Sequence, residues 1–304
     1  MSKKKTELTR GHVHLFLQRQ FAGKPENIQQ LVEGEESQAF SYECDGKGYV
    51  LRIHRGSVGF QKDAYAANHF HSEKLPIPRV IQVGSIDEHH AFCLTEKRPG
   101  FTFQDADPQM IRQLLEPITQ VWLALKECDL CETTGFGDFD ADGQGVYATW
   151  QEFLLSLFDS SAYDWSRVVQ FMGQTAFRYL VTPFISLAQS CPEERSLVHG
   201  DFGSNNVLTD GQNITAVLDW ENAKYGDPLF DVATAYFWSP WLNCMAAQAG
   251  YYDELLSTLP SYHERLRCYQ LRIGLDEIHD TVIHQNWRMA QWAIKRSTEI
   301  VHAL

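Results

Sequence analysis

The chain has 304 residues, of which 44% are hydrophobic and 21% charged, and its formal net charge is −13. This composition excludes a disordered protein, and the acidic balance disfavours nucleic acid as a partner because phosphates would be repelled. No apolar run approaches the roughly 20 residues that span a bilayer, and seven scattered cysteines fit reduced thiols, so we expect a cytoplasmic protein without membrane contact.

The first predicted elements are a helix and a β-hairpin. Helical periodicity over residues 9–22, with Thr9 as N-cap, predicts the helix. Residues 38–54 change to strand patterning around a turn at Asp45 to Gly48 and predict the hairpin. In its second strand, residues 49, 51 and 53 face one way and residues 50, 52 and 54 the other. Arg52 is therefore expected to share a sheet face with Val50.

The next segments predict a division into two lobes. A helix over residues 60–74 is expected to end before LPIPRV, where prolines stop it and a strand begins. The strand in FCLTEKRPG, residues 92–100, ends at Pro99 and Gly100, which we take as the boundary between lobes 1–98 and 99–304. Helical periodicity dominates afterwards, in residues 108–127, 149–159, 165–190, 228–256 and 261–302, apart from a short β segment around residues 197–208. The prediction is an α+β fold with a small β-rich N-terminal lobe, a larger mostly helical C-terminal lobe, and a cleft between them.

The segment LVHGDFGSNNVL, residues 197–208, concentrates polar side chains between apolar flanks. Two short strands, in NVLTD and ITAVLDW, form a hairpin. Asn206 begins its first strand and Asp219 ends its second, so both lie at the open end of the hairpin. Asp201, Asn206 and Asp219 are then expected to meet, and oxygen ligands of this kind suit Mg²⁺. Phosphoryl transfer uses such a group for positioning and charge neutralisation. The alternative is an asparagine- and aspartate-rich turn that only caps its own backbone.

At these residues the sequence resembles a known family. LVHGDFGSNNVL followed by AVLDWENAKYGDPLFDVA is similar to the aminoglycoside phosphotransferases, small-molecule kinases with the protein-kinase-like fold. Further segments of the resemblance span nearly the whole chain: EGEES (33–37), GYVLR (48–52), LPIP (75–78), ITAV (214–217), PWL (240–242) and LRIGLD (271–276). The resemblance implies a bilobal kinase-like fold and an enzyme that uses ATP (or GTP) and Mg²⁺. The implied acceptor is a hydroxyl of an aminocyclitol antibiotic, with hygromycin B as the expected one.

The resemblance also implies roles for individual residues. Asp201 would be the catalytic base or hydroxyl-orienting aspartate, Asn206 a magnesium ligand, and Asp219 the aspartate that bridges metal and nucleotide phosphates. Arg52 stands where many relatives carry a phosphate-binding lysine, and its guanidinium fork still offers two donors to a phosphate oxygen. Asp63 occupies the helix position of the usual partner glutamate. It either reaches Arg52 or is a solvated helix acid.

The implied nucleotide site departs from protein kinases in its phosphate loop. EGEESQAF holds only Gly34, so no GxGxxG cradle exists, and backbone N–H groups near Ser37 would contact the phosphates. Val50 fits the roof over the purine. The hinge, whose backbone would bind the purine edge, matches Thr95, Glu96, Lys97 and Arg98.

Other polar residues and motifs favour structural roles. We expect Asp227 to cap the following helix, and Asp231 and His199 to brace the catalytic loop. The run Asp138 to Gly143 resembles the start of an EF-hand, but Thr149 stands where the loop needs glutamate, so a solvated turn is expected. CDLC, residues 128–131, is a single CxxC without a second pair, and no structural metal is predicted.

Substrate recognition has the weakest sequence support. The acidic excess either serves solubility alone or forms a site for a cationic ligand. Asp276, Glu277 and Asp280 lie along one predicted helix, and the like charges at 276 and 280 repel unless a cation lies between them. We hypothesise that this face, with Glu221 as a further candidate, meets ammonium groups of the antibiotic. The aromatic residues Trp238 and Trp241 either belong to the core or stack on sugar rings.

Two other functions compete with antibiotic phosphorylation. One is a housekeeping kinase for an amino alcohol or sugar, since the family includes such activities. The other is a catalytically silent pseudokinase that binds nucleotide or ligand only. The presence of Asp201, Asn206 and Asp219 together argues against the second. We expect a monomer with a cationic small-molecule substrate.

Overall fold

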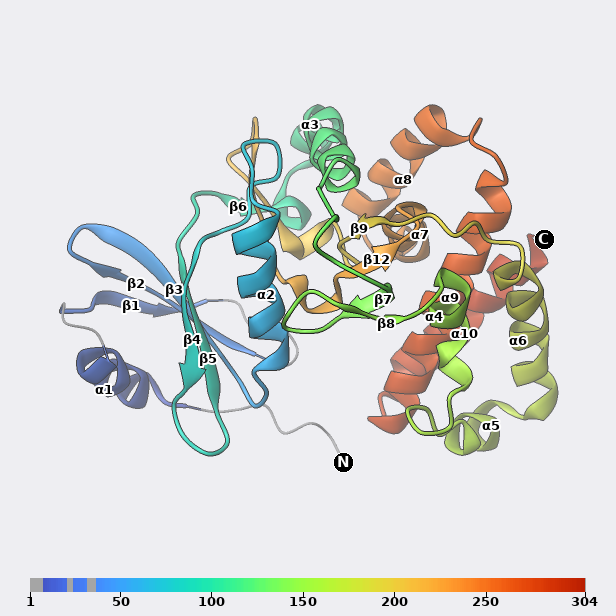
Figure 1. The fold of residues 1–304 in the computed structure, drawn as a ribbon, viewed down its shortest axis with the longest axis horizontal. Coiled ribbons are helices and arrows are strands. Elements are labelled where there is room, and N and C mark those ends of the chain that lie inside the picture. Colours follow the sequence, from blue (N-terminus) through green and yellow to red (C-terminus); the bar gives the residue numbers. More distant parts are fainter. Residues whose placement is uncertain (1–7, 21–23, 32–36, 304) are drawn as a thin grey trace.

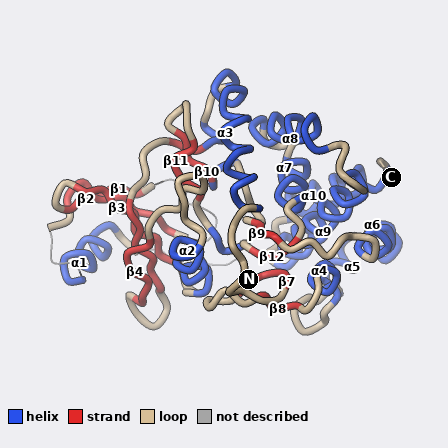
Figure 2. Tube along the Cα trace, turned by 45° about the horizontal axis from the view of Figure 1, so that its top comes forward, coloured by secondary structure: helices blue, strands red, loops and turns tan. Residues whose placement is uncertain are grey.

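A computed structural model describes residues 8–20, 24–31 and 37–303. The larger sheet lies at one end of the molecule and most helices at the other (Figure 1, Figure 2). The N-terminal region is a five-stranded antiparallel sheet in the order β1-β2-β3-β5-β4 with two helices. Its elements are α1 (Arg10–Gln20), β1 (Glu26–Gln30), β2 (Gln38–Cys44), β3 (Lys47–His54), α2 (Val58–His69), β4 (Val80–Ser85) and β5 (Ala91–Glu96).

The two N-terminal helices cover opposite faces of this sheet. On one face, Val13 and Leu17 of α1 pack with Leu51 and Ile53 of β3 in a buried cluster. On the other face, Phe60 of α2 packs with a second cluster at β4 and β5. Figure 1 shows α2 between the sheet and the C-terminal region. The alternation predicted for the second hairpin strand is therefore confirmed.

The first helix and the hairpin form as predicted. The Thr9 hydroxyl accepts a hydrogen bond from the backbone N–H of His12 at 3.3 Å, so Thr9 caps α1. Asp45 and Gly46 have positive φ of 51° and 72°, which allows a tight two-residue turn between β2 and β3. The helix predicted for residues 60–74 begins earlier and ends at His69. The predicted phosphate loop around Gly34 lies outside the described residues.

The C-terminal region contains two small sheets among helices. The orders are β11-β10-β6 and β8-β7-β12-β9. The strands are β6 (Phe101–Thr102), β7 (Phe136–Phe139), β8 (Gly145–Tyr147), β9 (Ser196–Val198), β10 (Val207–Thr209), β11 (Ile214–Val217) and β12 (Lys224–Gly226). The helices are α3 (Pro108–Lys126), α4 (Trp150–Leu155), α5 (Ser166–Met172), α6 (Gln174–Ala188), α7 (Leu229–Trp238), α8 (Asn243–Leu256), α9 (Tyr262–Ile283) and α10 (Trp287–His302). Short 3-10 turns are η1 (Phe103–Asp105), η2 (Ser156–Phe158), η3 (Ser204–Asn206) and η4 (Trp220–Asn222).

Three long predicted helices are each two helices. Gly173, with φ of 85°, separates α5 from α6. The segment with Pro240, which lacks a backbone N–H, separates α7 from α8. Gln285, with φ of 61°, lies between α9 and α10. Hydrophobic periodicity continued across these breaks because both helices of each pair bury an apolar face in the same core.

No helix among the described residues is long and apolar enough to cross a bilayer. The main core belongs to the C-terminal region and contains large aromatic side chains such as Trp122, Trp150 and Tyr269. This core supports β9 and α7, between which the polar segment 199–206 is held. The fold thus presents that segment on a rigid base.

Candidate active site

The loop that follows β9 is fixed from below by one carboxylate. Asp231, near the start of α7, accepts hydrogen bonds from the backbone N–H groups of His199 at 3.0 Å and Gly200 at 2.7 Å. Gly200 and Gly203 have φ of 85° and 113°, a region that favours glycine. The loop can therefore turn sharply and direct the next residue, Asp201, away from the core.

His199 acts as a second support of this loop. Its imidazole is fully buried, and Nε2 lies 2.9 Å from the carbonyl oxygen of Leu218. Burial lowers the pKa of His199 to about 4, so the ring is neutral at pH 7. Nε2–H then donates to Leu218, and Nδ1 accepts from the backbone N–H of Asp201 at 3.3 Å. The expected bracing roles of His199 and Asp231 are consistent with these hydrogen bonds.

The structure brings Asp201, Asn206 and Asp219 together. The amide nitrogen of Asn206 donates to the Asp201 carboxylate at 2.8 Å and to its backbone carbonyl at 3.0 Å. Leu218 N–H donates to the backbone carbonyl of Asn206 at 2.8 Å, which places Asp219 next to the pair. Desolvation and the negative charge of Asp219 raise the pKa of Asp201 above its ordinary value. The two carboxylates thus lie within electrostatic range of each other.

This group of residues fits a magnesium ion. Its donors are carboxylate and amide oxygens, the ligands that Mg²⁺ prefers. Asn206 directs its amide nitrogen toward Asp201, which leaves the amide oxygen available as a ligand. The side chain of Asp219 is 51% exposed, so a metal and its waters can reach it. The repulsion between the two carboxylates is the kind that a bound cation relieves.

Arg52 connects the sheet to this site. Its guanidinium donates to Asp63 of α2 and lies 3.6 Å from the Asp219 carboxylate. Burial would lower the pKa of Arg52, but Asp63 and Asp219 raise it, and the group stays charged. The ring of Phe60 lies 5.3 Å below the guanidinium carbon. Of the two alternatives for Asp63, the structure has the one in which it reaches Arg52.

The predicted hinge residues lie at the end of β5 and directly after it, and several of their polar groups already form hydrogen bonds within the protein. Backbone N–H groups of Glu96 and Lys97 donate to Arg79 at 3.1 Å and to Gly48 at 2.9 Å. The Thr95 hydroxyl meets the carbonyl oxygen of Val50 at 3.5 Å. The guanidinium Nε of Arg98 donates to the carbonyl of Thr215 at 3.0 Å. Ser37, the predicted phosphate-loop contact, is half-buried at the start of β2.

The acidic residues predicted for substrate recognition have partners of their own. Asp276 accepts a hydrogen bond from Tyr163 at 2.9 Å and lies 3.5 Å from Arg272. Asp280 lies 3.0 Å from the imidazole of His284. Arg272 therefore pairs with the carboxylate at position 276, and the imidazole of His284 lies beside the one at position 280. Glu277 is half-buried on α9 beside them.

Glu221 lies elsewhere, on η4 against α2. A Cβ added at Gly59 would lie 3.0 Å from its carboxylate. The structure therefore does not bring Glu221 into contact with the acidic residues of α9.

The predicted tryptophans form an aromatic group with Trp292 of α10. Trp238 stacks on Trp292 with a centroid distance of 5.1 Å and an interplanar angle of 9°. Trp241 meets the same ring edge-on at 5.2 Å and is 47% exposed. One face of Trp238 is therefore covered by protein, while Trp241 offers a ring to solvent.

Sequence reasoning missed two buried lysines near the site. Lys62 of α2 is 4% exposed and donates to the carbonyls of Glu221 and Ala223, the latter at 2.9 Å. Burial lowers the pKa of Lys62 to about 8. Lys224 of β12 is 6% exposed and pairs with Asp138 at 3.2 Å. A lysine beside apolar residues in a three-residue strand gives no sequence signal of burial.

Asp138 also corrects the sequence analysis. It was expected in a solvated turn, but it lies on β7, in register with Lys224 of β12. The turn itself comprises Asp140 to Gly143, where the Asp140 carboxylate accepts from the backbone of Asp142 and Gln144. The remaining residue of the EF-hand comparison, Thr149, caps α4.

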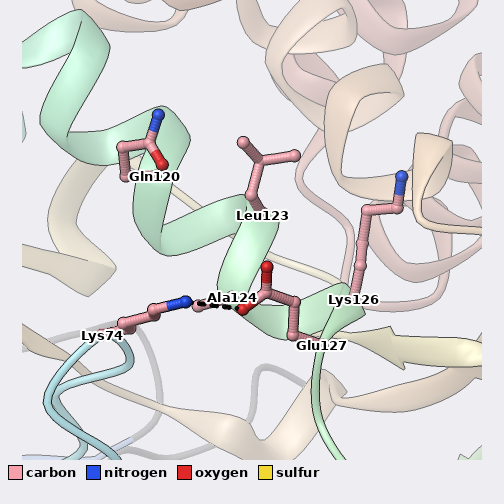
Figure 3. Close-up of a pocket in the computed structure, with 6 residues that line it drawn as sticks. All are labelled: Lys74, Gln120, Leu123, Ala124, Lys126 and Glu127. Carbon is pink, nitrogen blue, oxygen red and sulfur yellow. Dashed lines mark hydrogen bonds and ion pairs between the residues drawn. The ribbon is translucent and has the colours of Figure 1, made fainter.

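Three surface cavities lie apart from this site. One, of about 380 Å³, is lined by Lys74 and the C-terminal half of α3, and Lys74 pairs with Glu127 there at 2.9 Å (Figure 3). Another, of about 280 Å³, lies beside Trp122 and Arg265, and a third, of about 460 Å³, lies between α2 and the turn at Asp142. Asp201, Asn206 and Asp219 line none of the three.

The chain is similar to known phosphotransferases in sequence and in structure. The model of the phosphotransferase enzyme family matches residues 27–268. Hygromycin-B 4-O-kinase from Escherichia coli is 40% identical over 300 residues, covering 99% of this chain and 87% of that protein. A crystal structure of a thermostable mutant of aminoglycoside phosphotransferase APH(4)-Ia, a ternary complex with AMP-PNP and hygromycin B, is 41% identical and has a TM-score of 0.91, covering 95% of this chain and 98% of that one.

A more distant solved structure shares the fold alone. The GDP complex of wild-type aminoglycoside 2'-phosphotransferase-IIIa is 16% identical, with a TM-score of 0.68 over 97% of this chain and 99% of that one. The mixed α+β architecture predicted from the sequence is therefore confirmed.

Proposed function

This chain belongs to the phosphotransferase enzyme family, and from that premise we propose that it phosphorylates a hydroxyl of an aminocyclitol antibiotic, with hygromycin B as acceptor. The observation that carries the proposal is the convergence of Asp201, Asn206 and Asp219 on a loop held from the core. The full-length similarity to a hygromycin-B 4-O-kinase supports the acceptor. We also propose that the protein works in the cytoplasm and as a monomer.

In this proposal Asp201 serves the acceptor. As the hydroxyl oxygen attacks the γ-phosphorus of ATP, its proton passes to or is held by the Asp201 carboxylate. The bond from the γ-phosphorus to the bridging oxygen breaks, and ADP leaves. The Asn206 amide holds the carboxylate at 2.8 Å and so fixes the direction in which it meets the hydroxyl. A raised pKa makes Asp201 a better proton acceptor than an ordinary aspartate.

The charged residues around Asp201 would bind the nucleotide phosphates. Asn206 and Asp219 are the residues that would hold magnesium. When bound, that ion neutralises charge on the phosphate oxygens. Arg52 is held by Asp63, and its second terminal guanidinium nitrogen lies 3.6 Å from the Asp219 carboxylate. That nitrogen therefore faces the proposed site of the metal and the phosphates. We assign the purine to the hinge, residues 95–98, beneath Val50, within a nucleotide-binding lobe of residues 1–98, with residues 99–304 as the catalytic and substrate-binding lobe.

The acceptor would bind on the C-terminal region. Asp276, Glu277 and Asp280 supply negative charge on α9, and Trp241 supplies an exposed ring. An ammonium group of the antibiotic would compete with Arg272 and His284 for these carboxylates. Trp238 and Glu221 are further candidates for this surface. If neutralising Asp276 and Asp280 together leaves the acceptor KM unchanged, this part of the proposal is wrong.

The test is an ADP-release assay with a panel of acceptors. Hygromycin B, other aminoglycosides, amino alcohols and sugars are compared, with ATP or GTP as donor, and with Mg²⁺ present or chelated. We expect Mg²⁺-dependent release with hygromycin B and its loss in Asp201→Ala, with nucleotide affinity largely kept. Release with an amino alcohol or sugar alone would favour a housekeeping kinase. Nucleotide binding without release for any acceptor would favour a silent pseudokinase.

A further inference from the structure

Gly200, which directly precedes Asp201, is enclosed on the side where a side chain would project. A Cβ added there would lie 2.2 Å from the carbonyl oxygen of Asn222 and 2.8 Å from the ammonium nitrogen of Lys224. The backbone N–H of Gly200 is held by Asp231 at 2.7 Å. Glycine is therefore required both for its φ of 85° and because the backbone carbonyl of Asn222 leaves no room for a Cβ, while the end of the Lys224 side chain occupies the adjoining space.

Lys224 is held in this place by several contacts. Its side chain is 7% exposed, donates to the carbonyl of Asn222 and lies 3.2 Å from Asp138. The rings of Phe153 and Phe230 lie 5.6 Å and 5.3 Å from its ammonium nitrogen. A buried ammonium is costly unless it is paired, and Asp138 supplies the partner across the β7 to β12 ladder.

The strand order connects Lys224 to the reacting loop. β12 pairs with β7 on one side and with β9 on the other, and Lys224 is in register with Val198, the last residue of β9. The loop of Gly200 and Asp201 begins directly after Val198. A shift of Lys224 would therefore act on both the start of the loop and its glycine.

We propose that Lys224 is a positioning residue for phosphoryl transfer: its ammonium group, paired with Asp138, fills the space beside Gly200 and fixes the loop that directs Asp201. This inference rests on the phosphotransferase function proposed above. The lysine does not touch substrate, so its loss moves the catalytic carboxylate and leaves the nucleotide contacts intact. A misplacement of about 1 Å in such a group typically costs about a hundredfold in rate.

The test uses the full chain with ATP, Mg²⁺ and hygromycin B. In Lys224→Met the side chain remains an unbranched apolar stem, one atom shorter than the lysine side chain, and loses the ammonium group. We expect kcat to fall about tenfold to a hundredfold, with KM for ATP within about twofold. Asp138→Asn, which leaves the lysine without its carboxylate, lowers kcat by a smaller factor. The double variant resembles Lys224→Met because the two residues act through one contact.

Two controls separate positioning from loss of stability. Leu180→Ala, at a buried position on α6, destabilises the core far from the loop and should leave kcat unchanged below its melting temperature. Lys74→Met removes a lysine that is 74% exposed and should change neither rate nor stability. All variants are assayed well below their melting temperatures, and the exchange of the backbone N–H groups of residues 199–201 is measured by hydrogen exchange. Faster exchange at these amides in Lys224→Met and Asp138→Asn, but not in Leu180→Ala, is the expected result.

The outcomes distinguish this inference from the proposed function. A wild-type chain without turnover refutes the function itself. An active wild type with kcat in Lys224→Met within twofold overturns the inference and leaves the function standing. If Lys224→Met does not fold, Asp138→Asn decides: an unchanged kcat with unchanged exchange at residues 199–201 overturns the inference as well.

Discussion

Replacing Asp227 with alanine tests how much the buried contacts between the N-terminal end of α7 and α9 contribute to the stability of the protein. The Asp227 carboxylate is fully buried and accepts two hydrogen bonds from Arg265, both at 2.7 Å. It also accepts from the Tyr269 hydroxyl at 2.5 Å and from the N–H of Leu229 at 2.9 Å, so the expected helix cap is one of several contacts. Alanine leaves a guanidinium that is 6% exposed, with the half-exposed Glu194 at 3.2 Å as its remaining carboxylate and the carbonyl oxygen of Pro260 at 3.3 Å.

The magnitude follows from these contacts. Removing one partner of a buried ion pair costs about 3 to 5 kcal/mol, and losing a helix cap costs about 1 kcal/mol more. For a chain of 304 residues, this corresponds to a fall in Tm of about 6 to 9 °C. Differential scanning calorimetry of the wild type and Asp227→Ala measures the fall directly.

Glu127→Gln is the matched control for this prediction. It removes the ion pair of Lys74 and Glu127, whose side chains are 74% and 63% exposed, and should cost less than about 1 kcal/mol. Arg265→Met in the Asp227→Ala background should recover part of the lost stability, because no buried charge is then left unpaired. If Asp227→Ala melts within 2 °C of Glu127→Gln, the reasoning from burial is refuted.

Three further predictions concern pH, the nucleotide site and core packing. Because the pKa of His199 is about 4 in the folded protein and ordinarily about 6.5, the stabilisation it gives is complete above pH 6.5 and falls by about 3 kcal/mol by pH 4. His199→Asn should lack this part of the pH dependence in urea unfolding, and parallel curves for both proteins would contradict the assignment. Asp63→Ala removes the partner of Arg52 and should raise KM for ATP about tenfold in the ADP-release assay. An unchanged KM would show that Asp63 does not contribute to nucleotide binding. Gly226→Ala places a Cβ 2.1 Å from the Trp150 ring and should lower the free energy of unfolding by about 1 to 3 kcal/mol. Gly250→Ala, with open space around it, should not destabilise the protein. Equal melting temperatures of the two variants would contradict this packing argument.

The sequence was most informative where chemistry and local backbone coincide. Asp201, Asn206 and Asp219 lie within one hairpin unit, so turn and strand signals alone placed them close together. Turn and strand patterns of this kind depend on residues that are close in sequence. The structure keeps these contacts because they form within one short segment of the chain. The pairing of Arg52 with Asp63 was left open by the sequence: the resemblance to the family suggested it, and only the structure distinguished it from a solvated helix acid.

Nonlocal features could not be predicted in this way. β7, β8 and β12 have three or four residues each, too short for a periodic pattern, and they form because segments far apart in the chain pair with one another. Lys224 and Asp138 therefore had no visible relation before the strands were in register. The partners of Asp276 and Asp280 were missed for another reason. Arg272 and His284 each lie four residues away on the same segment and were left out of the charge count.

Helix α2 is attached to the C-terminal region by two consecutive side chains, with a consequence for how such an enzyme is controlled. Lys62 donates to two carbonyls of the segment after Asp219, and Asp63 accepts from the backbone N–H of Trp220 at 2.8 Å. Swinging the helix outward would break these three hydrogen bonds to charged side chains, each of which contributes about 1.5 to 3 kcal/mol. Fewer than about one molecule in a hundred would then be in an inactive arrangement at any time. With this helix held in place, the rate of such an enzyme would depend mainly on the supply of its two substrates.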